Sequence, residues 1–275
     1  MLHKINYIDH MKTSTIVLDQ AKPTAFLSAC PVYKPTPLYK ELIHDKPIWI
    51  KDEGQRMRLG AFKALGGVYA VAQLIAQKTE MDLDVNKFLS DEVKHIAKKM
   101  TFVCASAGNH AQGVAYSCNL LQIKGVIYMP KTTPKQKIKQ VQQFGKKYVE
   151  IILTGDTFDD AFSTAIAACE KDKSIFIHPF DDLKVIAGQG TVGLEILESA
   201  KKPIDYLFVP IGGGGLAAGL STVFKQLNHN TKIIGVEPEG APSMKTSIAN
   251  NKNTVKVFFI ILYWIIIAIR KKKKK

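Results

Sequence analysis

The stretch YLFVPIGGGGLAAGL at residues 206–220 decides how the rest of the chain is interpreted. Its apolar beginning predicts a buried strand, the glycines at 212–215 predict a turn, and the Leu- and Ala-rich end predicts a helix. Such a turn can bind a phosphate, because backbone N–H groups converge, the helix dipole favours an anion and no Cβ blocks close approach. The stretch has neither the Gly-Lys-Ser/Thr of a P-loop nor the spacing of a dinucleotide fingerprint. The alternative is a turn that only packs a helix on a strand.

Length and composition indicate a globular protein with one large or two modest domains. The chain has 275 residues, of which 46% are apolar. Its cysteines are Cys30, Cys104, Cys118 and Cys169. They lack the CxxC or CxxH spacing of a zinc site and suit a reducing compartment, and the first residues contain no apolar secretory region. We therefore expect a cytoplasmic protein.

The net charge of +14 is only a weak indication of a polyanionic partner. Seven basic residues and no acidic one fall within residues 254–275, so half of the net charge belongs to the last 22 residues. The other lysines are spread along predicted helix surfaces without interleaved aromatic residues. We therefore expect no nucleic-acid partner.

Strands and helices alternate along the chain, which predicts a parallel α/β fold. The expected strands are 47–51, 100–105, 125–129, 149–153, 175–177, 207–211 and 232–236. The expected helices are 62–78, 114–121, 135–143, 158–170 and 185–200, besides the one after the glycines. Residues 1–35 are interpreted as an arm over a domain, and Thr36-Pro37-Leu38 as the start of a short helix.

Lys63 lies at the start of the helix predicted over residues 62–78, where the helix dipole disfavours a cation. The helix terminus and desolvation would both lower the pKa of its amine, as a lysine that forms a Schiff base requires. Phe62 precedes it and two glycines follow at 66 and 67. The alternative is a solvated lysine on an amphipathic helix.

The sequence SAGNHAQG at residues 106–113 joins a predicted strand to a predicted helix. A small polar loop in this position can bind an anion, and the Ser106 hydroxyl with the backbone amides could receive a carboxylate. His110 could act as a general base, or it could be a loop histidine hydrogen-bonded to the structure.

Together these stretches resemble the threonine dehydratase group of pyridoxal-phosphate enzymes. The motifs follow in the family's order: TPL at 36–38, AFK at 61–63, SAGNHAQGVA at 106–115, HPFDD to VIAGQGTVGLEI at 178–196, GGGGLAAG at 212–219 and GVEPEGAPSM at 235–244. The resemblance implies the α/β fold called tryptophan synthase β-like, or fold type II, with two parallel-sheet domains and the cofactor between them. Residues 24–78 and 175–253 would form the large domain, and residues 79–174 the small domain.

The resemblance also implies roles for individual residues. Lys63 would form the Schiff base with pyridoxal 5'-phosphate, Phe62 would lie near the ring, and Asn109 would contact the ring hydroxyl. The phosphate would be held by Gly212, Gly213, Gly214, Gly215 and Leu216. The substrate carboxylate would be received by Ser106, Ala107, Gly108, Asn109 and His110. The implied activity is removal of water and ammonia from L-threonine, and from L-serine, to give a 2-oxo acid; the family is usually homo-oligomeric.

Departures from the family pattern bear on the substrate. The segment at residues 51–78 looks more like diaminopropionate ammonia-lyase, which we keep as an alternative. Ala107 stands where that enzyme carries an aspartate and serine racemase a serine, each used as a second base. An alanine side chain cannot act as this second base, which favours an L-specific dehydratase. Ser243 stands where a racemase-like metal site would need an acidic group, so we expect no metal.

The resemblance fades after Asn250, and residues 254–275 form an apolar and polylysine tail. As a helix, residues 257–269 would span about 20 Å against a hydrocarbon core of about 30 Å, too short to cross a membrane but sufficient for a weak interfacial anchor. We interpret the tail as out-of-frame translation that replaces part of the large domain. A truncated remnant without catalysis is therefore a further alternative, and an exposed apolar run would favour aggregation.

Overall fold

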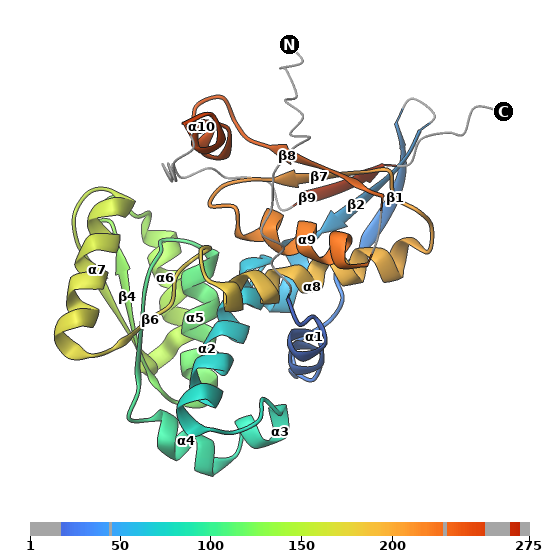
Figure 1. Cartoon of the computed structure of the whole chain (residues 1–275). Coiled ribbons are helices and arrows are strands. Elements are labelled where there is room, and N and C mark those ends of the chain that lie inside the picture. Colours follow the sequence, from blue (N-terminus) through green and yellow to red (C-terminus); the bar gives the residue numbers. More distant parts are fainter. Residues whose placement is uncertain (1–17, 44–45, 228–229, 251–264, 270–275) are drawn as a thin grey trace.

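The computed structural model describes residues 18–43, 46–227, 230–250 and 265–269. Its strands form one five-stranded and one four-stranded sheet, and a set of helices lies between the two (Figure 1). Most buried apolar side chains belong to one continuous core, to which strands of both sheets contribute, for example Phe102 and Leu207. The two sheets are therefore parts of one packed body.

The four-stranded sheet has the order β5-β4-β3-β6 and consists of β3 (Thr101–Ala105), β4 (Lys124–Met129), β5 (Val149–Leu153) and β6 (Ile175–Phe176). All its pairings are parallel. Side chains alternate along β3, so Phe102 and Cys104 join the main core. Val103 and Ala105 pack with residues of α7 (Phe158–Asp172) in a second cluster. Both faces are covered, which explains the continuous apolar runs and confirms the parallel prediction for this sheet.

The five-stranded sheet has the order β1-β2-β9-β7-β8 and consists of β1 (Leu38–Ile43), β2 (Lys46–Asp52), β7 (Tyr206–Pro210), β8 (Lys232–Val236) and β9 (Ile265–Ile269). Only β7 and β8 pair in parallel; the three other pairings are antiparallel. The short helix expected from Thr36 is wrong. Residues 38–43 pair with β2 instead, because the ladder hydrogen bonds of a hairpin outweigh a local helix-start signal.

Five residues of the tail form a strand. Ile265–Ile269 pairs with β2 on one side and β7 on the other, so its backbone lies inside the sheet. These residues are therefore not part of the helix considered as a weak interfacial anchor over residues 257–269, and residues 257–264 lie outside the described part. Within that part, none of the helices has the length and apolarity needed to span a bilayer.

Four helices form the middle of the molecule: α2 (Lys63–Thr79), α5 (Asn109–Leu121), α8 (Leu183–Ala200) and α9 (Gly215–Gln226). Residues 64–72 of α2 are buried on every side, because α5 and α8 pack against it. Glycines allow these helices to approach closely: a Cβ on Gly219 of α9 would lie 2.7 Å from the backbone nitrogen of Gly190 in α8. The site segments at the starts of α2, α5 and α9 are thereby fixed relative to one another.

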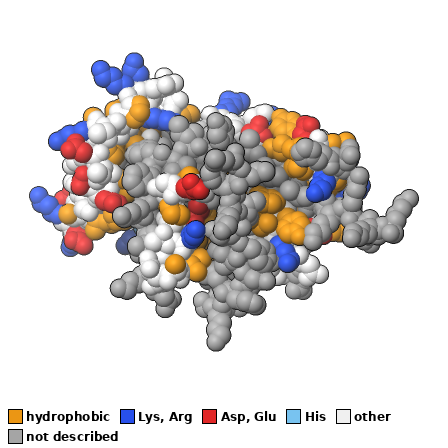
Figure 2. Space-filling model, turned by 90° about the horizontal axis from the view of Figure 1, so that it is seen from above, with side chains coloured by type: hydrophobic (Ala, Val, Ile, Leu, Met, Phe, Trp, Pro, Cys, Tyr) orange, Lys and Arg blue, Asp and Glu red, His pale blue; other side chains and the backbone are white. Residues whose placement is uncertain are grey.

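The remaining helices are α1 (Ala21–Ser28), α3 (Val85–Phe88), α4 (Asp91–Ala97), α6 (Lys135–Gly145), α10 (Ser243–Asn250), η1 (Glu53–Arg58) and η2 (Lys146–Tyr148). Helix α1 lies in the region interpreted as an irregular arm. Pro23 falls in its first turn, where a missing N–H breaks no helical hydrogen bond. On the face drawn in Figure 2, basic and acidic side chains of the described residues are interspersed.

Candidate active site

Lys63 is the first residue of α2, and the preceding residue, Phe62, provides no side-chain cap. Lys63 is half-buried, and burial lowers the pKa of its amine. Among the described residues, no carboxylate lies within ion-pair distance of it. A cation at a helix N-terminus without a counter-ion is disfavoured, so this amine is poised to lose its proton.

The loop after β3 leads directly into α5. The Ser106 hydroxyl oxygen accepts a hydrogen bond from the Gly108 N–H at 3.2 Å, and no side chain caps the first turn of α5. Asn109 begins the helix and its side chain is half-buried. The first-turn N–H groups of α5 therefore have no side-chain acceptor and can receive an anion.

His110 is fully buried behind this loop. Its Nε2 lies 3.3 Å from the Ile177 carbonyl oxygen. A carbonyl only accepts, so the ring proton is on Nε2, and Nδ1 has no hydrogen-bond partner in the described structure. Burial first, and the charge of Lys63 second, lower the pKa of His110 to about 3. A histidine this hard to protonate is a poor general base, which favours the structural alternative.

The glycine turn between β7 and α9 is closely packed on one side. A Cβ on Gly213 would lie 2.2 Å from the Phe180 ring, and a Cβ on Gly215 would lie 2.8 Å from the Phe180 carbonyl oxygen. Gly214 has a φ of +87°, a conformation that favours glycine. No side chain caps α9, and Leu216 is buried, so the turn offers backbone N–H groups rather than side chains.

A second contact anchors the glycine turn from α10. The Ser243 hydroxyl donates to the Gly212 carbonyl at 3.1 Å. The Glu237 carboxylate accepts from the N–H groups of Met244 and Lys245 at 2.7 and 3.0 Å, so it caps α10. In the described part of the chain, no three His, Cys, Asp or Glu side chains gather as metal ligands would.

Helix packing brings Lys63 and the loop after β3 together. A Cβ on Gly113 of α5 would lie 3.2 Å from the Ala64 Cα and 3.6 Å from the Lys63 carbonyl oxygen. The charge of Lys63 is also close enough to lower the pKa of His110. On its other face, α2 packs on α8, which in turn packs on α9. The glycine turn thus belongs to the same helical stack.

These groups fit pyridoxal 5'-phosphate, an aldehyde that carries a phosphate. The phosphate matches the uncapped start of α9, where glycines leave room for close backbone approach. The aldehyde matches the Lys63 amine with its lowered pKa. Both requirements are met by observed features of this chain.

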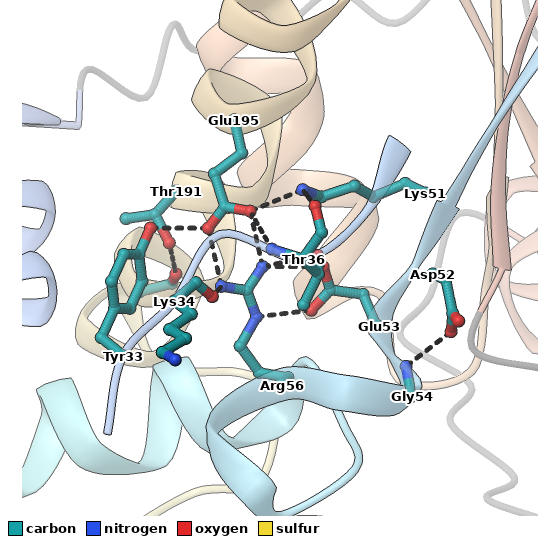
Figure 3. A network of polar contacts seen from close by, with 11 residues as sticks. Tyr33, Lys34, Thr36, Lys51, Asp52, Glu53, Gly54, Arg56, Thr191 and Glu195 are labelled. Atoms are coloured by element: carbon teal, nitrogen blue, oxygen red, sulfur yellow. Dashed lines mark hydrogen bonds and ion pairs between the residues drawn. The ribbon is translucent and has the colours of Figure 1, made fainter. Parts of the chain in front are cut away.

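Sequence reasoning missed a buried network of charges beside this site, which Figure 3 shows. Lys51, Glu53 and Arg56 are fully buried, and Glu195 of α8 is 5% exposed. Arg56 binds both carboxylates, and Lys51 binds Glu195 at 2.6 Å. In the sequence KDEGQR these residues look like a solvated loop. The available signal was Glu195, an acidic residue between Leu194 and Ile196 in the mostly glycine and apolar helix predicted over 185–200.

Phe180 is the other missed contact. It lies in the loop from β6 to α8, with its ring on Gly213 and at 4.8 Å from the His178 ring, edge to face. The sequence motif HPFDD contained it, but only the structure shows that it supports the glycine turn.

Comparisons with known proteins agree with this geometry. The sequence model of the family described as pyridoxal-phosphate dependent enzyme matches residues 29–261. The biosynthetic L-threonine dehydratase of Halalkalibacterium halodurans is 61% identical over 150 residues, which is 54% of this chain and 36% of the relative. That of Staphylococcus aureus strain NCTC 8325 is 42% identical over 252 residues, 89% of this chain and 55% of the relative. The chain thus spans about a third to just over half the length of these curated relatives.

Solved structures give the same fold. Threonine deaminase isoform 2 from Solanum lycopersicum superimposes with a TM-score of 0.66 at 35% identity, covering 90% of this chain and 70% of that one. Apo diaminopropionate ammonia lyase from Escherichia coli gives a TM-score of 0.72 at 27% identity, covering 84% and 67%. The resemblance inferred from the sequence motifs is confirmed at the level of the family.

Proposed function

Since this chain belongs to the family of pyridoxal-phosphate-dependent enzymes, we propose that it removes water and ammonia from L-threonine, and from L-serine, to leave a 2-oxo acid. The observation that carries the proposal is Lys63, an amine with lowered pKa at an uncapped helix start, stacked through α2 and α8 with a glycine turn. The relatives that are biosynthetic L-threonine dehydratases support the substrate.

Three parts of the site would bind the phosphate, the aldehyde and the ring of the cofactor. The N–H groups of Gly212 to Leu216 would hold the cofactor phosphate, and the Lys63 amine would bind its aldehyde. Phe62 would lie near the ring, and Asn109 would contact the ring hydroxyl. Pyridoxal phosphate, when bound, supplies the electron sink that makes the substrate's α-proton removable.

Substrate binding falls to the loop after β3. The Ser106 hydroxyl and the loop from Ala107 to His110, with the uncapped N–H groups at the start of α5, would receive the substrate carboxylate. The Lys63 amine would accept the substrate's α-proton, since burial lowers its pKa. The pKa of His110 is lowered to about 3, so it stays neutral and adds no positive charge beside the Lys63 amine.

Ala107 restricts the chemistry to one base. It is 3% exposed, and its methyl side chain cannot accept a proton. A proton can therefore be taken from only one face of the substrate, which favours L-specific elimination over racemisation. We also infer that residues 24–78 with 175–253 hold the cofactor and that residues 79–174 present the substrate. The reducing cytoplasm is the proposed location, which the four buried, free cysteines support.

Diaminopropionate ammonia-lyase is the second candidate, because its apo structure superimposes with a higher TM-score than the tomato threonine deaminase. That reaction eliminates an amine instead of a hydroxyl. Ala107 is the feature against it. Assays of 2-oxo acid release from L-threonine and from diaminopropionate, run side by side on one preparation, separate the two candidates.

The visible absorption spectrum of the purified chain tests the proposal. With pyridoxal 5'-phosphate added, we expect an absorption band from the cofactor bound to Lys63 that shifts when L-threonine is added, together with 2-oxo acid release. Lys63→Ala should abolish the band, whereas Lys78→Ala, at the other end of the same helix, should keep it. A wild-type protein that takes up no cofactor would show that this chain keeps the family's fold without its chemistry.

A further inference from the structure

The segment that leads into Lys63 has an unusual backbone. Met57 and Arg58 are consecutive non-glycine residues with φ of 49° and 58°, and Gly60 follows with φ of 72°. Left-handed conformations are unfavourable for residues with a Cβ, so they persist only where surrounding contacts fix them. Such conformations close to a reactive group indicate a segment whose shape is imposed from outside.

Arg56 is the anchor immediately before this segment. Its guanidinium, fully buried, donates to Glu53 through Nε and Nη2 at 2.8 and 2.7 Å. It also donates to Glu195 through Nη1 and Nη2 at 2.7 and 2.8 Å. Two forked pairs on one planar group fix both its position and its orientation.

Glu195 connects this anchor to α8. Its carboxylate also accepts from Lys51 Nζ and from the Tyr33 hydroxyl, each at 2.6 Å (Figure 3). Two buried cations face two buried carboxylates, so the network is balanced in charge. Balanced, fully hydrogen-bonded charges hold one geometry, because any movement leaves a buried charge without its partner.

The same helix holds the residues that follow Lys63. A Cβ on Gly188 would lie 2.8 Å from the Gly66 Cα and 2.8 Å from the Leu65 carbonyl oxygen, so α8 lies directly on the first turn of α2. Lys63 is therefore flanked by two contacts with α8, one through Arg56 before it and one through Gly66 after it.

We propose that the ion pair between Arg56 and Glu195 is a positioning device for Lys63: it holds the segment of residues 56–62, with its left-handed Met57, Arg58 and Gly60, and so fixes where α2 begins. The proposal rests on the proposed function in taking Lys63 as the cofactor lysine. Stability alone gives little reason for the pair, since buried ion pairs often contribute no more than apolar residues of the same volume. The pair instead serves to fix the position of Lys63.

Three variants of the full chain test this device. Glu195→Gln removes the charge that binds Arg56, and Tyr33→Phe removes one hydrogen bond to Glu195 and is expected to fold. Val141→Ala is the matched control, because it makes a cavity at a fully buried position in α6, away from α8. For each we would measure the melting temperature, the affinity for pyridoxal 5'-phosphate, and the fraction of Lys63 that borohydride reduction traps as the cofactor adduct, identified by peptide mass.

We expect Glu195→Gln to weaken cofactor affinity about tenfold and to lower the trapped fraction, and Tyr33→Phe to weaken affinity about threefold. Val141→Ala should leave both values unchanged even at an equal loss of melting temperature. If Glu195→Gln fails to fold, the cofactor affinity and trapped fraction of Tyr33→Phe test the proposal. Loss of melting temperature with unchanged trapping in the folded variants would show that the network is only structural. A wild-type chain with no trapping at Lys63 would instead remove the proposed function, and this inference with it.

Discussion

Two lysines twelve positions apart show how differently one residue type can be used in this fold. Lys51 is fully buried and bound to Glu195 at 2.6 Å and to the Thr36 carbonyl at 2.7 Å. Lys63 has no carboxylate partner in the described structure. Burial lowers the pKa of both amines, but at Lys51 the nearby Glu195 acts against it. A lysine bound to a carboxylate holds structure, whereas one without a carboxylate partner is available for chemistry.

The acidic partner confirms the contrast. Burial alone would raise the pKa of the Glu195 carboxyl, but Arg56 and Lys51 hold it below its usual range. The region around Lys63 has the opposite character, since burial keeps both Lys63 and His110 easy to deprotonate. On one side of the helical stack, buried charges are thus paired with one another, whereas on the other side burial disfavours the charged forms of Lys63 and His110.

Lys63→Ala should have the largest effect on turnover of the predicted variants. If turnover did not fall, the contrast between Lys63 and Lys51 would be wrong. We expect turnover to fall by at least about a thousandfold, because the group that binds the cofactor and accepts the proton is gone. Stability should change little, since no ion pair is lost. Rates of 2-oxo acid release and thermal melting check this, with Lys78→Ala as the control. A variant that keeps turnover would exclude Lys63 as the catalytic group.

Lys51→Met should act in the opposite way, chiefly on folding. Removal of this cation takes away one of the two positive partners of the buried Glu195 carboxylate. The free energy of unfolding should fall by about 3 kcal/mol. Urea denaturation measures it. The control is Lys94→Met, because Lys94 pairs with an exposed Asp91 at 3.7 Å and should change stability by less than about 1 kcal/mol. Equal losses in the two variants would contradict a special role for burial.

Gly213→Ala sharpens the comparison at the phosphate end. The added methyl would lie 2.2 Å from the Phe180 ring, so the ring or the turn must move, at a cost of about 1–3 kcal/mol. Cofactor affinity should fall together with stability, because the turn itself is displaced. Gly240→Ala is the matched control, since a Cβ there would have no neighbour within 4 Å. Unaltered affinity in Gly213→Ala would place the phosphate elsewhere.

Much of this could be predicted from the sequence, because local signals specify it. The parallel strands of the four-stranded sheet follow from apolar runs that end at polar loops, and β7 with α9 follows from the glycine turn. Lys63 could be singled out from its place at a helix start. Each of these signals lies within about ten residues of the feature it predicts.

The rest depends on contacts between distant segments. Glu195 lies 139 positions from Arg56, so nothing in the sequence KDEGQR predicts that the guanidinium is buried. Likewise, residues 265–269 read as part of an apolar helix, because a strand buried between two neighbours and a short apolar helix segment look alike. Only pairing with β2 and β7 distinguishes them.

The smallest expected effect is the loss of folding stability as the pH is lowered, which should differ between the two regions. The pKa of His110 is lowered to about 3 in the folded chain, so below its ordinary value near 6.5 the unfolded chain binds a proton that the folded chain refuses. Stability attributable to His110 is therefore lost as pH falls from about 6.5 towards 3, by up to roughly 1.4 kcal/mol per pH unit.

Glu195 responds only at lower pH. Its folded pKa is lowered, so its contribution is complete above the ordinary glutamate value near 4.3 and is lost as pH falls through the folded pKa. Among the described groups, we therefore assign the slope of stability between pH 6.5 and 4.5 to buried His110 and half-buried His178, since burial lowers the pKa of both. Urea unfolding across this range should show a smaller slope in His110→Asn than in wild type, and an unchanged slope in Glu195→Gln. The reverse result would mean that the ion-pair network around Glu195, and not His110, responds first to acid.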